Sequence, residues 1–242
     1  MKPILVFSPA RCGSQVLMSI VRSYSPGKSK ITEYFNIRRF KVIDGGDKII
    51  SVRLAERQTI NNKFNEHKKR VNLLKKYNNK KIPIKIVGTQ MSEIIFNYVK
   101  TEYTVVTINR KNKYDQLLSW IISTNTGVWH SDHRPNIYPK IIADVKLVDQ
   151  FVKKQIELYK FWRQRFLTEE IILTEFSYEE LTEDSPNFQN IINTLGFTFD
   201  DRNLIDMPQK IHTLEEKEKL IINIDEINEY INSNFFEHYF NI

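Results

Sequence analysis

The chain has 242 residues, of which 41% are hydrophobic and 27% are charged, and this composition is typical of a folded globular protein rather than a disordered one. No apolar run reaches the ~18 residues that cross a membrane, and the first residues lack the features of a signal peptide. The single cysteine, Cys12, excludes an intrachain disulfide framework and a multi-cysteine metal site. We therefore expect a cytoplasmic protein with no membrane insertion.

The formal net charge is +7, and much of the excess lies between Lys63 and Lys81, where eight Lys and Arg residues accompany one acid, Glu66. Apolar residues recur through this segment at helical spacing, which predicts an amphipathic helix. One interpretation of its basic side chains is a solvated helix face. The other is a surface that binds an acidic substrate or partner.

Strands and helices are expected to alternate along the chain. Short apolar or β-branched runs predict strands at residues 2–7, 82–87, 104–108 and 171–173. Apolar residues at helical spacing predict helices at residues 16–21, 91–100, 114–122, 145–166 and 188–195, with a short helix near residue 178. Asn112 is the expected N-cap of the 114–122 helix, and Gly196 is the expected end of the 188–195 helix.

This alternation indicates the α/β class, with a parallel sheet flanked by helices on both faces. The sequence contains no internal repeat and no linker-like stretch. We therefore expect one domain that spans residues 1–242.

The loop between the first expected strand and the first expected helix is suited to binding an anion. Residues 8–15 are Ser-Pro-Ala-Arg-Cys-Gly-Ser-Gln. The first N–H groups of a helix have no partner within it, and the helix dipole adds positive potential there. Gly13 permits close approach of the backbone, Ser14 adds a hydroxyl donor, and Arg11 adds a permanent cation. An ordinary strand-to-helix turn is the alternative interpretation.

This loop differs from that of the nucleotide triphosphatases, which requires G-x-x-x-x-G-K-[ST]. Ser14 stands where the lysine would be, and the first glycine is missing. The segment from Ser8 to Leu17 instead resembles the 5′-phosphosulfate loop of sulfotransferases, whose usual pattern is P-x-[RK]-S-G-[ST]-x-x-L. Members of that family transfer a sulfuryl group from 3′-phosphoadenosine 5′-phosphosulfate (PAPS) to an acceptor.

Two later segments resemble the same family in the expected order. After the strand 104–108, Arg110 and Ser119 are similar to the family's 3′-phosphate motif, an arginine at a strand end followed by a serine inside the next helix. A guanidinium and a hydroxyl that converge on one phosphate give charge-assisted hydrogen bonds. Further on, a Y-E-E-L run that begins at Tyr178 and a leucine–glycine pair that ends at Gly196 are similar to the family's final blocks.

The resemblance covers residues 3–200 and departs from the family in two respects. Gln15 and Val16 stand where family members often have a tryptophan that stacks on adenine. The Arg-Lys-Gly segment near the C-terminus of animal cytosolic members is not evident, and Lys210 is the cation that would replace it.

The segment Glu33-Tyr34-Phe35 and the residues around Arg110 look closest to the bacterial branch that sulfates trehalose and related carbohydrates. The resemblance therefore implies PAPS as donor, 3′,5′-adenosine bisphosphate as product, no metal ion, and a carbohydrate or other small alcohol as acceptor. The nucleotide-binding residues that it implies are Arg11, Cys12, Gly13, Ser14, Gln15, Arg110, Ser119, Tyr178 and Lys210. Arg11 is also the expected catalytic cation beside the leaving phosphate, and core packing is the alternative role of Tyr178.

A base must accept the proton of the acceptor hydroxyl, and the sequence offers alternatives. By resemblance to the carbohydrate-acting branch, Glu33 is the leading catalytic candidate, and a solvated glutamate is the other interpretation. His130 and His133 lie in a loop that can line the acceptor site, but two histidines without a third ligand do not define a metal site. Lys85 resembles a lysine that several sulfotransferases direct into the site, and an edge-strand gatekeeper is its alternative role.

Two other functions stay open from the sequence alone. A P-loop-type nucleotide kinase or triphosphatase of the same broad fold would depend on Mg²⁺ and a loop lysine. A non-catalytic nucleic-acid-binding protein would use the basic 63–81 helix and bind with steep salt dependence. No nucleic-acid motif accompanies that helix, so nucleic acid is the less expected partner. The sequence does not indicate an oligomeric state.

Overall fold

The structure of the chain is a computed structural model that describes residues 2–24, 40–43, 49–52, 60–129, 138–182, 188–200, 212–234 and 236–240. The strands are β1 (Ile4–Ser8), β2 (Phe40–Ile43), β3 (Ile49–Val52), β4 (Ile84–Val87), β5 (Thr104–Asn109) and β6 (Leu173–Ser177). The α-helices are α1 (Ser14–Tyr24), α2 (Ile60–Asn79), α3 (Glu93–Glu102), α4 (Lys113–Thr126), α5 (Leu147–Phe151), α6 (Leu158–Thr168), α7 (Tyr178–Thr182), α8 (Phe188–Thr194), α9 (Leu214–Leu220), α10 (Ile224–Ser233) and α11 (Glu237–Phe240). A 3-10 turn, η1 (Gly88–Gln90), follows β4, and a π-helical stretch, η3 (Val152–Glu157), joins α5 to α6.

Among the described residues, four strands form a parallel sheet in the order β4-β1-β5-β6, and β2 and β3 pair separately as an antiparallel hairpin. The chain runs from β1 to β4 on one side of β1, and from β5 to β6 on the other. The connections therefore diverge between β1 and β5. In open α/β sheets, ligands bind outside the carboxyl ends of the strands at such a switch point.

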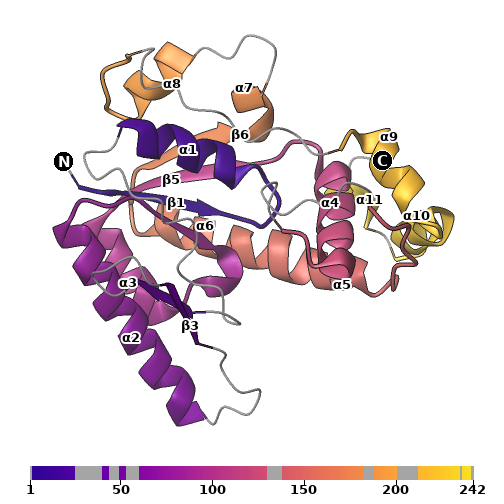
Figure 1. Ribbon diagram of the computed structural model, residues 1–242, viewed down its shortest axis with the longest axis horizontal. Helices are drawn as coiled ribbons and strands as arrows, with labels where there is room; N and C mark the ends of the chain where they lie inside the picture. Colours follow the sequence, from indigo (N-terminus) through magenta and orange to yellow (C-terminus); the bar gives the residue numbers. More distant parts are fainter. Residues whose placement is uncertain are drawn as a thin grey trace.

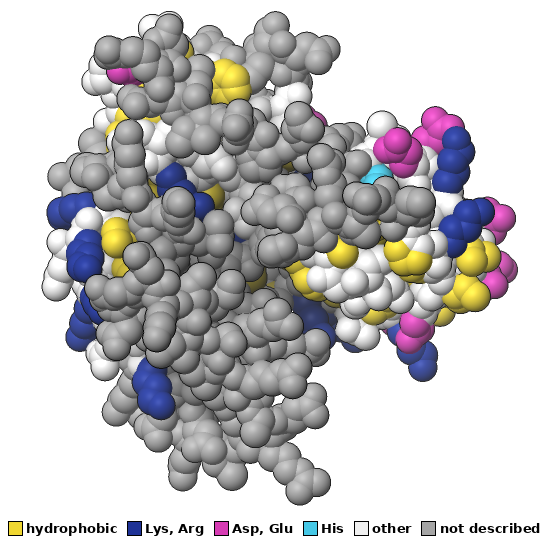
Figure 2. Space-filling model, in the orientation of Figure 1, with side chains coloured by type: hydrophobic (Ala, Val, Ile, Leu, Met, Phe, Trp, Pro, Cys, Tyr) yellow, Lys and Arg dark blue, Asp and Glu magenta, His cyan; other side chains and the backbone are white. Residues whose placement is uncertain are grey.

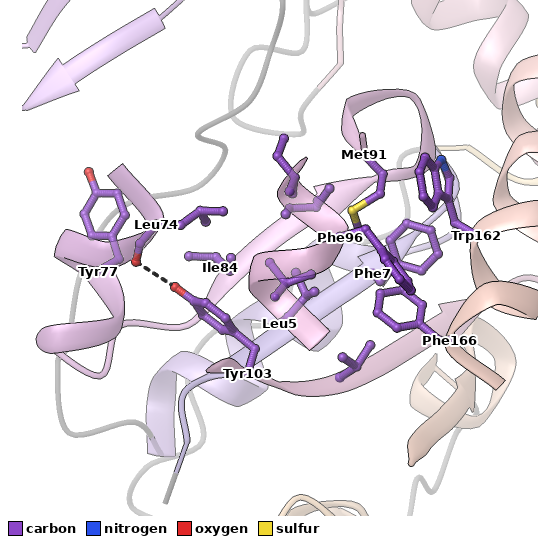
Figure 3. Close-up of a cluster of buried hydrophobic side chains, with 14 of the residues drawn as sticks. Leu5, Phe7, Leu74, Tyr77, Ile84, Met91, Phe96, Tyr103, Trp162 and Phe166 are labelled. Carbon is purple, nitrogen blue, oxygen red and sulfur yellow. Dashed lines mark hydrogen bonds between the residues drawn. The ribbon is translucent and has the colours of Figure 1, made fainter. Parts of the chain in front are cut away.

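Helices cover both faces of this sheet, which confirms the predicted α/β class (Figure 1). On one face, α1 and α8 pack against Val6, Val106 and their neighbours. On the other face, side chains of α2, α3 and α6 enclose Leu5 and Phe7, and Figure 3 shows how closely these rings and aliphatic groups fit together. All five residues of β1 are buried, as expected for a parallel strand covered on both sides.

Tyr103 connects helix α2 to the segment of chain that enters β5. Its ring is buried beside α2, and its hydroxyl donates a hydrogen bond to the Leu74 carbonyl oxygen at 3.0 Å (Figure 3). Because a buried hydroxyl without a partner is unfavourable, this bond fixes α2 against the segment that enters β5.

The C-terminal helices α9, α10 and α11 pack with α4 and α5 beside the carboxyl ends of the strands (Figure 1). The backbone of Ile141 bonds to that of Leu220 and Ile222, both at 2.9 Å. The Asn223 side chain accepts from the Ala143 N–H and donates to the Ala143 carbonyl oxygen, also at 2.9 Å. These bonds join the C-terminal segment to the chain that precedes α5.

Two predicted elements differ from the structure for identifiable reasons. The predicted strand at 171–173 is wrong in position, because Glu170 adopts a φ of 57° and Ile171 N–H bonds back to Phe166, which closes α6 before β6 begins at Leu173. The predicted helix at 145–166 is continuous but becomes π-helical over η3. The hairpin β2–β3 and the helices α9–α11 were not predicted. No helix among the described residues is both long and apolar enough to span a bilayer.

Candidate functional site

The loop from β1 to α1 has a backbone that most residues adopt only under strain. Arg11 has a φ of 60° and Gly13 a φ of 81°, both in the left-handed region. A Cβ atom on Gly13 would lie 2.0 Å from Cδ2 of Tyr178, the first residue of α7. Glycine is therefore required here both by its φ and by the close approach of the Tyr178 ring to the loop backbone.

Two buried glutamines hold this loop in position through Ala10. The Ala10 N–H donates to Oε1 of Gln155 at 2.8 Å, and Nε2 of Gln116 donates to the Ala10 carbonyl oxygen at 2.6 Å. Gln116 belongs to α4, and Gln155 belongs to the π-helical stretch η3. π-Helical turns are frequent at functional sites. Neither glutamine was predicted from the sequence, because glutamine at a helical position is most often solvated.

Cys12, Ser14 and Gln15 are the next predicted residues of the loop, and they differ in burial. Cys12 is fully buried, and its thiol lies 3.0 Å from the Pro9 carbonyl oxygen, to which it donates. Burial raises the pKa of the Cys12 thiol, and the Ser8 hydroxyl opposes this only in part, so the thiol stays neutral near pH 7. Ser14 is buried as the first residue of α1, and Gln15 is partly exposed. The Cys12 side chain therefore packs inside the hydrophobic cluster beneath α1.

Arg11 brings the loop together with α4. Its Nε donates to Oγ of Ser119 at 3.0 Å, and its guanidinium also donates to the carbonyl oxygen of Trp129, just beyond α4. Ser119 is buried and lies on α4, whereas Arg11 is partly exposed. Two residues that were predicted from separate motifs therefore meet at one point.

Arg110 belongs to a buried charge cluster at the end of β5. Its guanidinium donates to Oδ2 of Asp115, and the Lys217 ammonium donates to Oδ1 of the same carboxylate. Arg110, Asp115 and Lys217 expose only 6%, 4% and 5% of their surface. Among the described residues, two cations therefore share one carboxylate in a buried region, where charges interact strongly.

The local sequence explains how Asp115 reaches this position. Asn112 is the N-cap of α4, as predicted, and its side chain accepts from the Asp115 N–H at 2.8 Å. The Glu179 carboxylate accepts from the N–H groups of Lys111 and Asn112 at 3.0 Å and 3.3 Å, which joins α7 to the β5–α4 turn. These bonds fix the turn that carries Arg110.

Tyr178 and Arg110 stack at the same edge of the sheet. The Arg110 Cζ atom lies 4.5 Å from the centre of the Tyr178 ring. Among the described residues, the buried Nε of Arg110 has no hydrogen-bond partner. A buried donor without an acceptor is unfavourable, so this nitrogen would gain from an anion that enters beside the ring.

Lys85 is buried on β4 and is in register with Val6, on the face of the sheet that α1 covers. Among the described residues β4 is an edge strand of the sheet, so both interpretations of Lys85 stay open. Glu33, His130, His133 and Lys210 lie outside the described residues. In the described parts of the chain, no group of three or more His, Cys, Asp and Glu side chains could hold a metal ion.

The basic segment 63–81 lies in α2 up to Asn79, and its last two residues follow the helix. Its described side chains Lys69, Lys75, Lys76, Lys80 and Lys81 are exposed, whereas Arg70 is buried. Figure 2 shows Lys and Arg side chains on the side of the molecule where α2 lies, and a mixture of basic and acidic side chains over the C-terminal helices. The exposed lysines fit the interpretation of a solvated helix face.

Comparison with protein-family models and with curated proteins gives no match to this chain. The chemistry of the site therefore has to be inferred from its geometry. The loop, with the start of α1 and Arg11, can hold one anionic group. The Arg110–Asp115–Lys217 cluster can hold a second, and the Tyr178 ring lies beside both. Such a site suits a small molecule with two anionic groups and an aromatic ring.

Proposed function

We propose that this chain is a sulfotransferase with a P-loop-like sulfotransferase fold, which transfers a sulfuryl group from PAPS to a hydroxyl of a carbohydrate or other small alcohol. The observation that carries the proposal is the contact of 3.0 Å between Nε of Arg11 and Oγ of Ser119. It joins the motif that resembles a 5′-phosphosulfate loop to the motif that resembles a 3′-phosphate site.

Arg110, Ser119 and Lys217 are the groups that would bind the 3′-phosphate. Arg110 and Lys217 supply two cations at the carboxyl end of β5, and the Nε of Arg110, which has no hydrogen-bond partner among the described residues, supports an anion at this point. Lys217 is an additional cation that the sequence analysis did not assign, and Lys210 stays a predicted contact. Tyr178, which already packs on Gly13 and Arg110, would flank the adenine.

The reaction forms a bond between the acceptor oxygen and sulfur and breaks the bond between sulfur and the 5′-phosphate oxygen. The electron pair of the broken bond stays on that phosphate oxygen, and Arg11 with the α1 N-terminus stabilises its charge. The acceptor hydroxyl loses its proton to a base, and Glu33 is the proposed base. The rigid hold of Gln116 and Gln155 on Ala10 preorganises the loop for this charge.

The test is a transfer assay with PAPS labelled in its sulfuryl group, a panel of sugars and small alcohols as acceptors, and EDTA in parallel samples. We expect label to appear in an acceptor, with release of 3′,5′-adenosine bisphosphate, at the same rate with and without EDTA. Hydrolysis or transfer with ATP that needs Mg²⁺, and none with PAPS, would favour the kinase-like alternative.

A further inference from the structure

Lys113, the first residue of α4, carries an ammonium whose hydrogen-bond partners in the described parts of the chain are neutral amide oxygens. Its Nζ donates to Oδ1 of Asn109, at the end of β5, and to Oε1 of Gln116 at 3.4 Å. Among the described residues, no carboxylate lies within ion-pair distance of this ammonium, and the side chain is partly buried. Its neighbour Lys111 differs, because it is exposed and lies 3.8 Å from Glu180.

The Lys113 ammonium lies at the switch point between β1 and β5, beside the loop that joins β1 to α1. Gln116, which accepts from Lys113, donates in turn to the Ala10 carbonyl oxygen at 2.6 Å. Asn109 is the last residue of β5, the strand that borders β1. The ammonium is therefore connected to the loop by a single glutamine side chain.

The charged and titratable groups that face Lys113 come from several elements. Glu179 of α7 favours its charged form, as does Cys12 of the loop where its thiol is ionised, whereas Lys160 of α6 and Arg110 after β5 oppose it. Burial is the largest influence, and it lowers the pKa of Lys113 to about 8. A partly dehydrated ammonium near two other cations is stabilised by any anion that comes within reach.

We propose that Lys113 binds the anionic group held by the β1–α1 loop, which under the proposed function is the 5′-phosphosulfate end of the donor. This assignment rests on the proposed function and adds a residue to it. Asn109 and Gln116 are positioning residues that aim the ammonium toward the loop. The amide oxygens hold the ammonium without neutralising it, so its full charge is available to the ligand.

The first test compares two nucleotides by calorimetry at pH 7. These are 3′,5′-adenosine bisphosphate and 3′-AMP, which lacks the 5′ group. We expect Lys113→Gln to weaken binding of the bisphosphate by a factor on the order of 10 to 100, the value of one charged hydrogen bond, and to leave 3′-AMP binding unchanged. Lys113→Arg should retain part of the affinity, and Lys111→Gln, the matched control, should retain all of it.

Equal losses for both nucleotides, or no loss for either, would overturn the role of Lys113 while leaving the proposed function intact. If the wild-type protein binds neither nucleotide, the proposed function fails instead. A second measurement then tests Lys113 alone, by NMR titration of protein labelled at the lysine Cε carbons, with Lys113→Gln used to assign the signal. We expect an apparent pKa near 8 without added anion, and a rise when inorganic sulfate is added. A titration that sulfate does not move would refute the assignment.

Discussion

Lys217 donates a hydrogen bond to Asp115 across 102 residues of sequence, and both side chains are buried. The same carboxylate accepts from Arg110. A buried ion pair is favourable only when its partners are all present, because each charge has lost its hydration. Asp115 therefore does two things at once, since it holds the C-terminal helix α9 against α4 and keeps two cations at the carboxyl end of β5.

Asp115→Asn tests how much the negative charge of Asp115 contributes to the stability of the fold. The variant keeps the shape of the side chain but removes the charge that Arg110 and Lys217 share in a buried position, so we expect a loss of about 3–5 kcal/mol in the free energy of unfolding. Denaturant unfolding measures it. Inorganic sulfate should restore more stability to the variant than it adds to the wild type.

The matched control for this substitution is Asp149→Asn. Asp149 accepts from the Tyr230 hydroxyl at 2.8 Å and belongs to no buried cluster of cations. Its replacement should cost about 1 kcal/mol. If the two variants lose the same stability and respond alike to sulfate, then Arg110 and Lys217 do not attract an anion when the Asp115 carboxylate is removed.

Arg110→Gln should remove selectivity for the 3′-phosphate. The variant loses the guanidinium that stacks on Tyr178, and we expect affinity for 3′,5′-adenosine bisphosphate to fall by a factor on the order of 10 to 100, with that for 5′-AMP unchanged. Calorimetry with both nucleotides gives the result. Arg163→Gln is the control. Arg163 lies away from the loop and donates two hydrogen bonds to the Glu175 carboxylate, at 2.5 Å and 2.8 Å.

Gly13→Ala should disturb the loop without touching a charge. The added methyl group would meet the Tyr178 ring at 2.0 Å, on a residue whose φ is 81°. We expect a loss of about 1–3 kcal/mol in stability from overpacking, together with a change in tyrosine fluorescence as the ring moves. Gly127→Ala is the informative comparison, because its φ is 72° but nothing lies within 4 Å of its Cβ position. Equal effects at both positions would mean that backbone strain alone, and not the Tyr178 contact, decides the outcome.

The sheet could be predicted because its strands are short, apolar and buried on both faces, so periodicity and composition agree. The N-cap at Asn112 also follows from a local pattern. The contact of Arg11 with Ser119 spans 108 residues of sequence and was not predicted. The roles of Lys113 and Lys217 could not be predicted, because their importance depends on what surrounds them after folding. Lys217 lies in a helix whose other basic residue, Lys219, is a surface lysine paired with Glu215, and no spacing rule separates the two.

The same limit applies to Gln116 and Gln155. A glutamine that accepts from a loop N–H looks, in sequence, like any polar helix residue, and the π-helical stretch that carries Gln155 has no simple pattern. The helices α9 and α11 were missed because they are short and depend on packing on α4 and α5. In contrast, α10 has Ile224, Ile227 and Ile231 at helical spacing, a pattern that could have predicted it.

Stability should rise with pH above about pH 8 because of Lys113. The pKa of this lysine is about 8 in the folded chain and 10.5 ordinarily. Between these values the unfolded chain binds a proton that the folded chain does not, so the free energy of unfolding increases with pH. Lys113→Gln should abolish this rise, as measured by denaturant unfolding between about pH 7 and pH 9.5.

The measurement stops at about pH 9.5 because buried tyrosines change the stability at higher pH. Burial raises the pKa of Tyr114 and Tyr159 to about 12. A folded pKa above the ordinary value of 10 means that stability is lost as pH rises beyond about 10.

A pH profile of Lys113→Gln that matches the wild type below pH 9.5 would show that the Lys113 ammonium is not desolvated.

The central claim is that the site binds a nucleotide with a phosphate on the 3′ position and an anionic group on the 5′ position. The most direct measurement is calorimetric titration of the wild-type protein with 3′,5′-adenosine bisphosphate, 5′-AMP and ATP, with ATP tested in the presence and absence of Mg²⁺. We predict that the bisphosphate binds more tightly than 5′-AMP by a factor on the order of 30 or more, as expected for charged hydrogen bonds to Arg110 and Lys217, and that ATP binds weakly in both conditions. Equal affinity for the bisphosphate and 5′-AMP, or tighter binding of ATP with Mg²⁺, would contradict the account.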